Sequence, residues 1–157
     1  MPAEQRLGLD VKRAEQALMA AKHEAVKPLT VPQYAAMFAV AQCPGSSSAA
    51  LARACLVTPQ AMTVVLKNLT DLGYVIREPH PVHAHVLETR LTPAGQAAFE
   101  RADTAAVTIE RRIRSAFTPA ERDNLRALLI RFAAAARDLA LPGQPSVGSH
   151  RTPRRRR

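Results

Sequence analysis

The segment "ALARACLVTPQAMTVVLKNLTDLGYVIRE", residues 50–78, decides the fold that we expect for this chain. Thr58 stands directly before Pro59, an arrangement typical of a helix start. The threonine hydroxyl caps the helix, and the missing N–H of proline costs nothing at the first helical position, where an N–H would have no partner within the helix. Gly73 suits the left-handed residue that ends a helix. Between them, apolar side chains recur at helical spacing, at Met62, Leu66 and Leu69. The segment therefore predicts a short helix, a turn and a second helix that leads directly into a strand.

The residues before this segment add two helices. Apolar side chains recur every three or four residues over about 6–27 and about 31–42, and both runs end next to a proline. Thr30 and Gln33 predict a capping box at the start of the second run. Serines at 46–48 cap the short third helix, which we expect over about 48–56. Three helices thus precede the helix that begins after Thr58.

The residues after this segment predict a hairpin and two further helices. "YVIRE" (74–78) and "VLETRL" (86–91) read as short strands, joined by "PHPVHAH" (79–85). Thr92 and Thr118 each precede a proline and mark two more helix starts. Their apolar stripes are Phe99, Ala102, Ala106, Ile109, Ile113 and Phe117, and then Leu125, Leu128, Leu129, Phe132 and Leu139. Helices followed by a hairpin are typical of a winged helix-turn-helix, whose last helix before the hairpin enters the major groove of DNA.

The composition agrees with a mainly α-helical protein. Of the 157 residues, 47% are hydrophobic and 4% are aromatic, with no Trp, so the core is built from Ala, Leu and Val. The net charge of +9 favours a polyanionic partner. Arg151 and Arg154 to Arg157 supply five of these charges, so the charge of the folded part is a weaker argument for nucleic-acid binding.

Other function classes lack their sequence signals. The first residues have no secretory signal, and no apolar run reaches the length of a membrane span, so we expect a cytoplasmic protein without membrane contact. Cys43 and Cys55 form no C-x-x-C motif, which argues against disulfides and zinc. Because Cys55 lies on the apolar side of its helix, we expect inert packing rather than redox sensing. No phosphate loop, nucleophile elbow or H-E-x-x-H motif is present, so we expect neither an enzyme nor a cofactor.

Four stretches together resemble the MarR family of transcriptional regulators, named for multiple antibiotic resistance. They are "LTVPQYAAMFAV", the segment quoted first, "LTPAGQAAFE" after the hairpin, and "FTPAERDNLRALLIRF". The resemblance covers roughly residues 5–140. It implies a homodimer that binds a palindromic operator on double-stranded DNA, usually as a repressor that a small ligand releases.

The resemblance also implies a domain organisation. We expect a single MarR-like domain over 1–141, mainly α, with a two-stranded β-wing. Within it, a winged helix-turn-helix lobe covers about 30–92, and long dimerisation helices cover about 5–28 and 93–141. Residues 142–157 have no apolar period and should form a disordered basic tail. This tail either adds non-specific attraction to phosphates or is dispensable.

The expected DNA contacts lie mostly on the exposed side of the fourth helix. Gln60 suits an adenine edge, and Ala61 or Thr63 suits a thymine methyl, while Lys67 and Arg53 would contact the backbone. The amino end of this helix should supply free N–H groups and a positive dipole end. A merely solvated face is the alternative interpretation. The full expected set is Ser48, Arg53, Thr58, Pro59, Gln60, Ala61, Thr63, Val64, Lys67, Asn68, Arg77, His80, His83, His85 and Arg90.

The sequence departs from the family pattern at three places. Val64 stands where members commonly have a basic residue. Leu56 replaces a glycine that often ends the third helix, so we expect the turn to form without a left-handed residue. In the wing, His83, Ala84 and His85 stand where the family usually carries an Asp-Arg-Arg-like set, whose arginine reaches the minor groove.

A ligand cleft is implied between the dimer helices and the DNA-binding lobe. Its expected residues combine aromatic and cationic side chains, which suit a small lipophilic or aromatic effector such as a carboxylate or phenol. Ordinary packing at the dimer interface explains the same residues equally well. The candidates are His23, Lys27, Tyr34, Met37 and Phe38.

Histidines at the hairpin tip allow two interpretations. His80, His83 and His85 have the chemistry of metal ligands, but no Cys or Asp lies in the tip, so we expect no metal site. The favoured interpretation is that His83 or His85 enters the minor groove in place of arginine.

Two other functions remain open. One is a protein that binds DNA without sequence preference. The other is a ligand-binding or protein-interaction module that has lost operator recognition, which Val64 and the missing wing arginines make plausible.

The wing histidines predict a pH-dependent affinity for DNA. Phosphates should raise the pKa of His83 or His85 in the complex, so the added affinity is full at low pH and is lost as the pH rises through the bound-state pKa. The double variant His83→Ala/His85→Ala should bind DNA more weakly near pH 6 and lose this pH dependence. Fluorescence anisotropy from about pH 5.5 to about pH 8, a range that includes the usual pKa of histidine, measures both effects. Wild-type affinity and wild-type pH dependence in that variant would contradict the interpretation.

Overall fold

A computed structural model describes residues 2, 5–79 and 86–140, the last three of these by their backbone alone. Contacts divide the chain into two units, 1–113 and 114–157, and each is described by itself. The elements are α1 (Leu7–Ala25), α2 (Val31–Gln42), α3 (Ser48–Ala54), α4 (Pro59–Asp71), β1 (Val75–Pro79), β2 (Leu87–Leu91), α5 (Pro93–Ser115) and α6 (Pro119–Ala140). This order and the two-stranded sheet confirm the expected fold class.

Side-chain caps fix the helix starts where the sequence predicts them. Thr30 forms the expected capping box with Gln33 at α2, and Ser47 accepts from the Ala50 N–H at α3. Helices α4, α5 and α6 begin after threonines whose hydroxyls accept an N–H three residues along the chain, whereas α1 begins without a side-chain cap. These pairs are Thr58 with Ala61, Thr92 with Gly95, and Thr118 with Glu121. Each cap satisfies an amide that would otherwise lack a partner.

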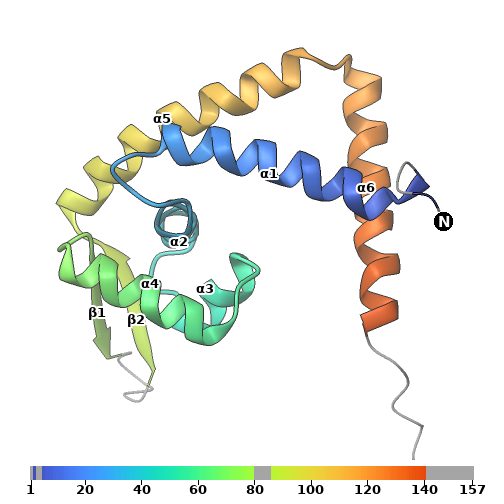
Figure 1. Ribbon diagram of the computed structural model, residues 1–157. Helices are drawn as coiled ribbons and strands as arrows, with labels where there is room; N and C mark the ends of the chain where they lie inside the picture. Colours follow the sequence, from blue (N-terminus) through green and yellow to red (C-terminus); the bar gives the residue numbers. More distant parts are fainter. Residues whose placement is uncertain (1, 3–4, 80–85, 141–157) are drawn as a thin grey trace, which may run out of the picture. The chain divides into compact units, whose positions relative to one another are not determined.

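Helix α2 is the centre of the first unit. α1 and α5 lie on one side of it, and α3, α4 and the hairpin lie on the other (Figure 1). The side chains that fill this core come from α2, α3, α4, α5, the two strands and the turn after α1. The largest fully buried ones are Met37, Leu51, Met62, Leu66, Leu69, Val26, Val40, Val75 and Thr89. The apolar stripe that the sequence predicts for α4 is therefore buried as expected.

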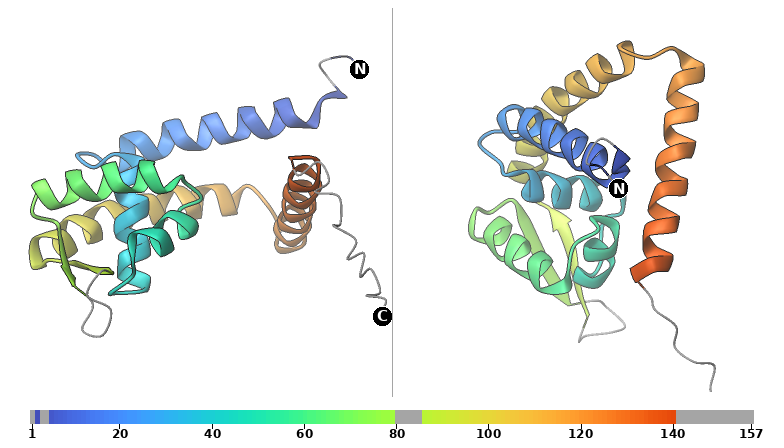
Figure 2. Two further views of the ribbon diagram at one scale, coloured as in Figure 1. Left: turned by 90° about the horizontal axis from the view of Figure 1, so that it is seen from below. Right: turned by 45° about the vertical axis from the view of Figure 1, so that its right-hand side comes forward.

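The hairpin packs against α4 and extends past it (Figures 1 and 2). β1 and β2 are antiparallel, with Val75 opposite Leu91 and Arg77 opposite Thr89. Thr89 lies deepest on the face that packs inward, and its backbone N–H and C=O bond to Ser46 and Gly45. The loop between α2 and α3 thereby holds the outer edge of β2. Residues 80–85, with the three expected wing histidines, lie outside the described residues.

The first turn of α5 is locked to the turn that follows α4. Thr92 donates its hydroxyl to the carbonyl of Gly73 at 2.7 Å, and its N–H bonds to the carbonyl of Tyr74 at 3.0 Å. A Cβ at Gly95 would overlap that same Tyr74 carbonyl, so only glycine permits this approach. The glycine of "LTPAG" is thus explained by backbone packing.

The turn between α3 and α4 corrects one sequence expectation. Leu56 itself adopts the left-handed conformation, with φ of 56°, where we expected a turn without such a residue. The N–H of Leu56 bonds to the carbonyl of Arg53, and the N–H of Val57 bonds to that of Ala52, which is the pattern of a glycine-type helix end. Leu56 is 92% exposed, so no packing offsets the strain of its backbone.

In the second unit, 114–157, the structure describes residues 114–140, most of which form α6. No side chain that the structure describes in α6 is buried within the single chain, and Leu139 of the predicted stripe lies among the residues described by their backbone alone. Leu125, Leu128 and Leu129 are all exposed, and Phe132 is half-buried. In α5, Phe99, Ala102 and Ala106 are buried, whereas Ile113 is exposed; Phe117 lies beyond the end of that helix.

Among the residues that the structure describes, no single helix is long and apolar enough to cross a membrane. α3 and α4 reach the required length and composition only as a pair, bent by 110°.

The left-handed turn predicts a stabilising substitution. Leu56→Gly should raise the free energy of unfolding by about 0.5–1 kcal/mol, because glycine removes the left-handed strain and the exposed leucine contributes no packing. Urea unfolding at one fixed protein concentration measures this.

The matched control is Leu72→Gly. Leu72 is also exposed, at 52%, but caps α4 with an ordinary φ of −78°. Glycine there should lower the free energy of unfolding by about 0.5–1 kcal/mol. A Leu56→Gly variant that is also destabilised would contradict the role of the turn.

Candidate functional site

One side of α4 is buried and the opposite side is fully exposed. Met62, Leu66 and Leu69 fix the helix in the core. The side chains expected to contact DNA from this helix and its cap all lie on the exposed side: Thr58, Pro59, Gln60, Ala61, Thr63, Val64, Lys67 and Asn68. Val64 is 60% exposed, so an apolar side chain stands in the middle of this otherwise polar surface. We call these eight residues the α4 face.

The amino end of α4 offers fewer free amides than the sequence suggests. Pro59 has no N–H, and the N–H of Ala61 bonds to the Thr58 hydroxyl at 3.2 Å. The N–H of Met62 bonds to the Thr58 carbonyl. Within the described part of the chain, this leaves the N–H of Gln60 as the single amide of the first turn without a partner. An anion there would meet one N–H group, not the several that we expected.

Two polar groups of the α4 face are engaged within the helix. Thr63 donates its hydroxyl to the carbonyl of Pro59 at 2.9 Å, so only its methyl group and its acceptor capacity remain for a ligand. Lys67 forms an ion pair with Asp71, with 2.6 Å between Nζ and Oδ2. Because this pair is exposed, it costs little to open for a phosphate.

The other expected DNA contacts come from α3 and the hairpin. Arg53 is exposed at the end of α3, whereas Ser48 is half-buried in its first turn. Arg90 is exposed on β2 and pairs with Glu88 at 2.7 Å. Arg77 is half-buried on β1, and its Nε is buried without a hydrogen-bond partner. Arg77 therefore has an unused donor at the base of the hairpin.

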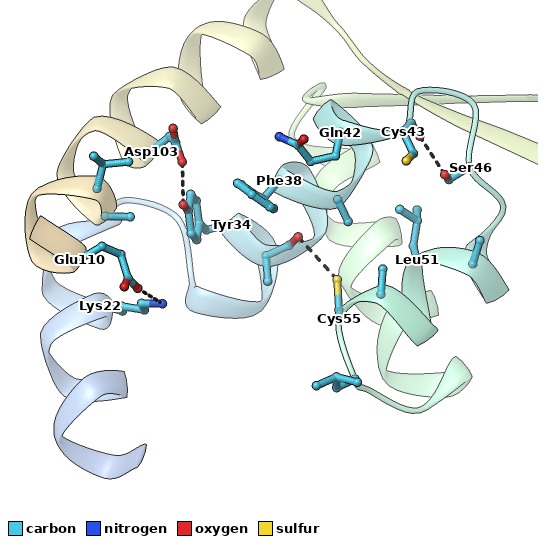
Figure 3. A pocket seen from close by; sticks show the side chains of 17 residues that line it. Lys22, Tyr34, Phe38, Gln42, Cys43, Ser46, Leu51, Cys55, Asp103 and Glu110 are labelled. Carbon is cyan, nitrogen blue, oxygen red and sulfur yellow. Dashed lines mark hydrogen bonds and ion pairs between the residues drawn. The ribbon is translucent and has the colours of Figure 1, made fainter. Parts of the chain in front are cut away.

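A cavity of about 750 Å³ adjoins α2 and α3 (Figure 3). Its wall combines α1, α2, α3 with the turn after it, and α5. The lining includes Lys22 from α1, Tyr34 and Phe38 from α2, Leu51 from α3 with Cys55 directly after that helix, and Asp103 and Glu110 from α5. Leu56, the left-handed residue, also lines this cavity. We call it the α2 pocket.

Aromatic rings form the inner wall of the α2 pocket. Tyr34 lies 6.3 Å from Phe38, and Phe99 supports both from behind at 6.1 and 6.2 Å between ring centroids. Such distances are typical of favourable aromatic pairs. The inner wall is therefore aromatic and largely apolar.

Charged groups gather at one end of the pocket (Figure 3). Tyr34 donates its hydroxyl to Oδ1 of Asp103 at 2.7 Å. Burial, and then this hydrogen bond, raise the pKa of Tyr34, so the phenol stays protonated as a donor. Beside it, Lys22 pairs with Glu110 at 3.0 Å and joins α1 to α5.

The structure brings two of the five expected effector residues to this pocket. Tyr34 and Phe38 line it. Met37 is fully buried in the core, and His23 is exposed on α1. Lys27 is exposed and pairs with Glu24 at 2.8 Å. These three residues lie outside the lining.

Sequence reasoning missed the charged lining residues. Asp103 and Glu110 are seven residues apart on α5, directly beside the buried positions Phe99 and Ala106. A carboxylate that flanks an apolar stripe at this spacing was the available signal. Lys22, the third charged residue of the lining, lies on α1, where it pairs with Glu110.

Both cysteines line the α2 pocket. Cys55 is half-buried and donates its thiol to the carbonyl of Ala35 at 3.5 Å. Burial raises the pKa of this thiol, which agrees with the expected inert packing. Cys43 is exposed at the end of α2. Among the described residues, no three His, Cys, Asp or Glu side chains are grouped to hold a metal ion.

Comparison with known proteins links this architecture to one family. The sequence model of the MarR family matches residues 27–84. The HTH-type transcriptional repressor Rv2887 of Mycobacterium tuberculosis is 35% identical over 101 residues, which are 64% of this chain and 73% of the relative.

Solved structures give the same result. The M. tuberculosis MarR family protein Rv2887 in complex with p-aminosalicylic acid has a TM-score of 0.62 and 32% identity, over 82% of this chain and 98% of that one. The transcriptional repressor CouR, bound to a 23-mer DNA duplex, has a TM-score of 0.75 and 24% identity, over 83% and 94% of the two chains. The similarity to CouR shows a shared fold only.

Proposed function

Because this chain belongs to the MarR family of transcriptional regulators, we propose that it binds a palindromic operator as a homodimer and that a small aromatic ligand releases it. The family consists of DNA-binding proteins without enzymatic activity, which confirms the expectation that the chain is not an enzyme. As a regulator of transcription, it would act in the cytoplasm.

The exposed α4 face is the observation that carries the proposal. Its residues stand opposite a fully buried stripe, so the helix is held rigidly while Gln60, Asn68 and Lys67 remain accessible. Amide side chains recognise base edges, and a lysine contacts phosphates. The hairpin beside α4 supplies Arg77 and Arg90 as further positive groups.

The exposed apolar residues of α6 support dimerisation. Leu125, Leu128 and Leu129 follow one another at helical spacing without burial in the single chain. An apolar stripe of this kind is stabilised by a second helix. Two recognition helices held by one dimer would contact half-sites one DNA turn apart.

The α2 pocket supports ligand control. Its wall contains Leu51, Cys55 and Leu56 of α3 and the following turn, which lead directly into α4. A ligand that binds better to an arrangement unsuited to DNA shifts the population toward that arrangement. The relative Rv2887, solved with p-aminosalicylic acid, supports an aromatic ligand.

Selection of bound DNA from a random pool at about 0.15 M salt tests the regulator. We expect an enriched inverted repeat with half-sites roughly 10–11 base pairs apart. Binding without enrichment would favour the sequence-indifferent alternative, and the lack of any binding would favour the ligand-binding module. A single, unrepeated half-site would contradict the dimer.

Gln60→Ala then tests the α4 face on the selected duplex. The affinity should fall by about tenfold or more, because one amide contact to a base is lost. Gln16→Ala changes a glutamine that is also exposed but lies on α1; it is the matched control and should leave the affinity unchanged. Equal affinities of the two variants would contradict recognition through α4.

A further inference from the structure

The charged lining of the α2 pocket is more acidic than basic. Its charged side chains are Lys22, Asp103 and Glu110. Two carboxylates and one ammonium group leave the pocket with a net negative charge. An aromatic wall beside a net negative charge is unsuited to an aromatic carboxylate.

Among the described residues, Lys22 is the single cation of the lining, and it is already paired. Nζ of Lys22 lies 3.0 Å from Oε1 of Glu110, and the lysine side chain is only 21% exposed. A carboxylate ligand that took Lys22 for itself would displace Glu110. The displaced carboxylate and Asp103 would then both repel the new anion across the same cavity.

Asp103 is available to a cation. Its Oδ1 accepts the hydroxyl of Tyr34, which is a neutral donor and leaves the negative charge in place. Among the described residues, no lysine or arginine pairs with Asp103. Its carboxylate therefore faces the cavity without a basic partner, next to the ring of Tyr34 (Figure 3).

The aromatic wall adds a second attraction for positive charge. The faces of Tyr34 and Phe38 carry negative potential, and a cation within about 6 Å of such a ring is stabilised. The same wall accepts a flat aromatic ring by stacking. The carboxylate of Asp103 and the aromatic rings thus both favour a ligand that carries a positive charge and a flat aromatic ring.

We propose that the α2 pocket takes an aromatic amine, bound by its ring against Tyr34 and Phe38 and by its ammonium group at Asp103. This inference rests on the proposed ligand-controlled regulator and names the chemical class of its ligand. The overall charge of +9 does not oppose it, because five of those charges lie in residues 151–157 and exposed charges are screened within about 8–10 Å in physiological salt.

Calorimetric titration of the full-length protein with three phenols of similar size tests the ligand class. Tyramine carries an ammonium group, 4-ethylphenol carries no charge, and 3-(4-hydroxyphenyl)propionate carries a carboxylate. Tyramine should bind about tenfold more tightly than 4-ethylphenol, and the propionate should bind most weakly. Tightest binding by the propionate, or no binding by tyramine, would overturn the inference.

Two variants assign the preference to individual charges. Asp103→Asn should weaken tyramine binding about tenfold and leave 4-ethylphenol unchanged, because the amide keeps the size and loses the charge. Glu110→Gln should strengthen propionate binding about tenfold, because Lys22 is then free to pair with it. Glu24→Gln, which removes an exposed carboxylate outside the pocket, is the control and should keep the wild-type order.

The neutral phenol separates charge from folding. If Asp103→Asn loses all three probes equally, Asp103 acts through the structure of the pocket and the inference is contradicted. The outcome is also separate from that of the DNA selection: an enriched palindrome together with a preference for the propionate would overturn the ligand class and leave the regulator intact.

Discussion

Burial of the α4 stripe is the constraint on which the rest of the structure depends. Met62, Leu66 and Leu69 are fully buried, and together they fix both the depth and the rotation of the helix. With a helical repeat of 3.6 residues, a fixed buried side leaves a fixed exposed side. The α4 face is therefore determined by core packing, and apart from Thr58, which caps the helix, its exposed side chains contribute little to the fold.

The connections at both ends of α4 follow from this constraint. At its start, Leu56 accepts a left-handed backbone so that α3 can turn into α4. At its end, Gly73 also adopts a positive φ, and Thr92 then ties the turn to α5. The turn residues thus connect α4 to both the pocket wall and the long helix that follows.

The position of α3 gives a physical basis for ligand control. Leu51 is buried in the core, yet it also borders the α2 pocket. Well-packed residues transmit displacement because interiors have few voids. A ligand that moves α3 would therefore move α4, and the coupling would be reciprocal, so DNA would weaken ligand binding by the same factor.

Local sequence signals predicted the fold well and the pocket poorly. Threonine caps and apolar spacing act over three or four residues, so the helix starts and the buried stripe of α4 were predictable. The pair of Tyr34 and Asp103 joins residues 69 positions apart, and no local rule reports such a contact. Leu56 was mispredicted because the preference for glycine is energetic, and a cost of about 1 kcal/mol can be offset elsewhere in a fold.

The central claim is that the α4 face is the surface that contacts DNA, and lysine footprinting tests it on the wild-type protein. Lys12, Lys27 and Lys67 are all exposed and each pairs with an acidic neighbour on its own helix or helix end, so their reactivities are comparable. Their acetylation rates, followed by mass spectrometry with and without the selected duplex, should fall at Lys67 and stay constant at Lys12 and Lys27. An unchanged rate at Lys67 with protection of Lys12 or Lys27 would contradict the account.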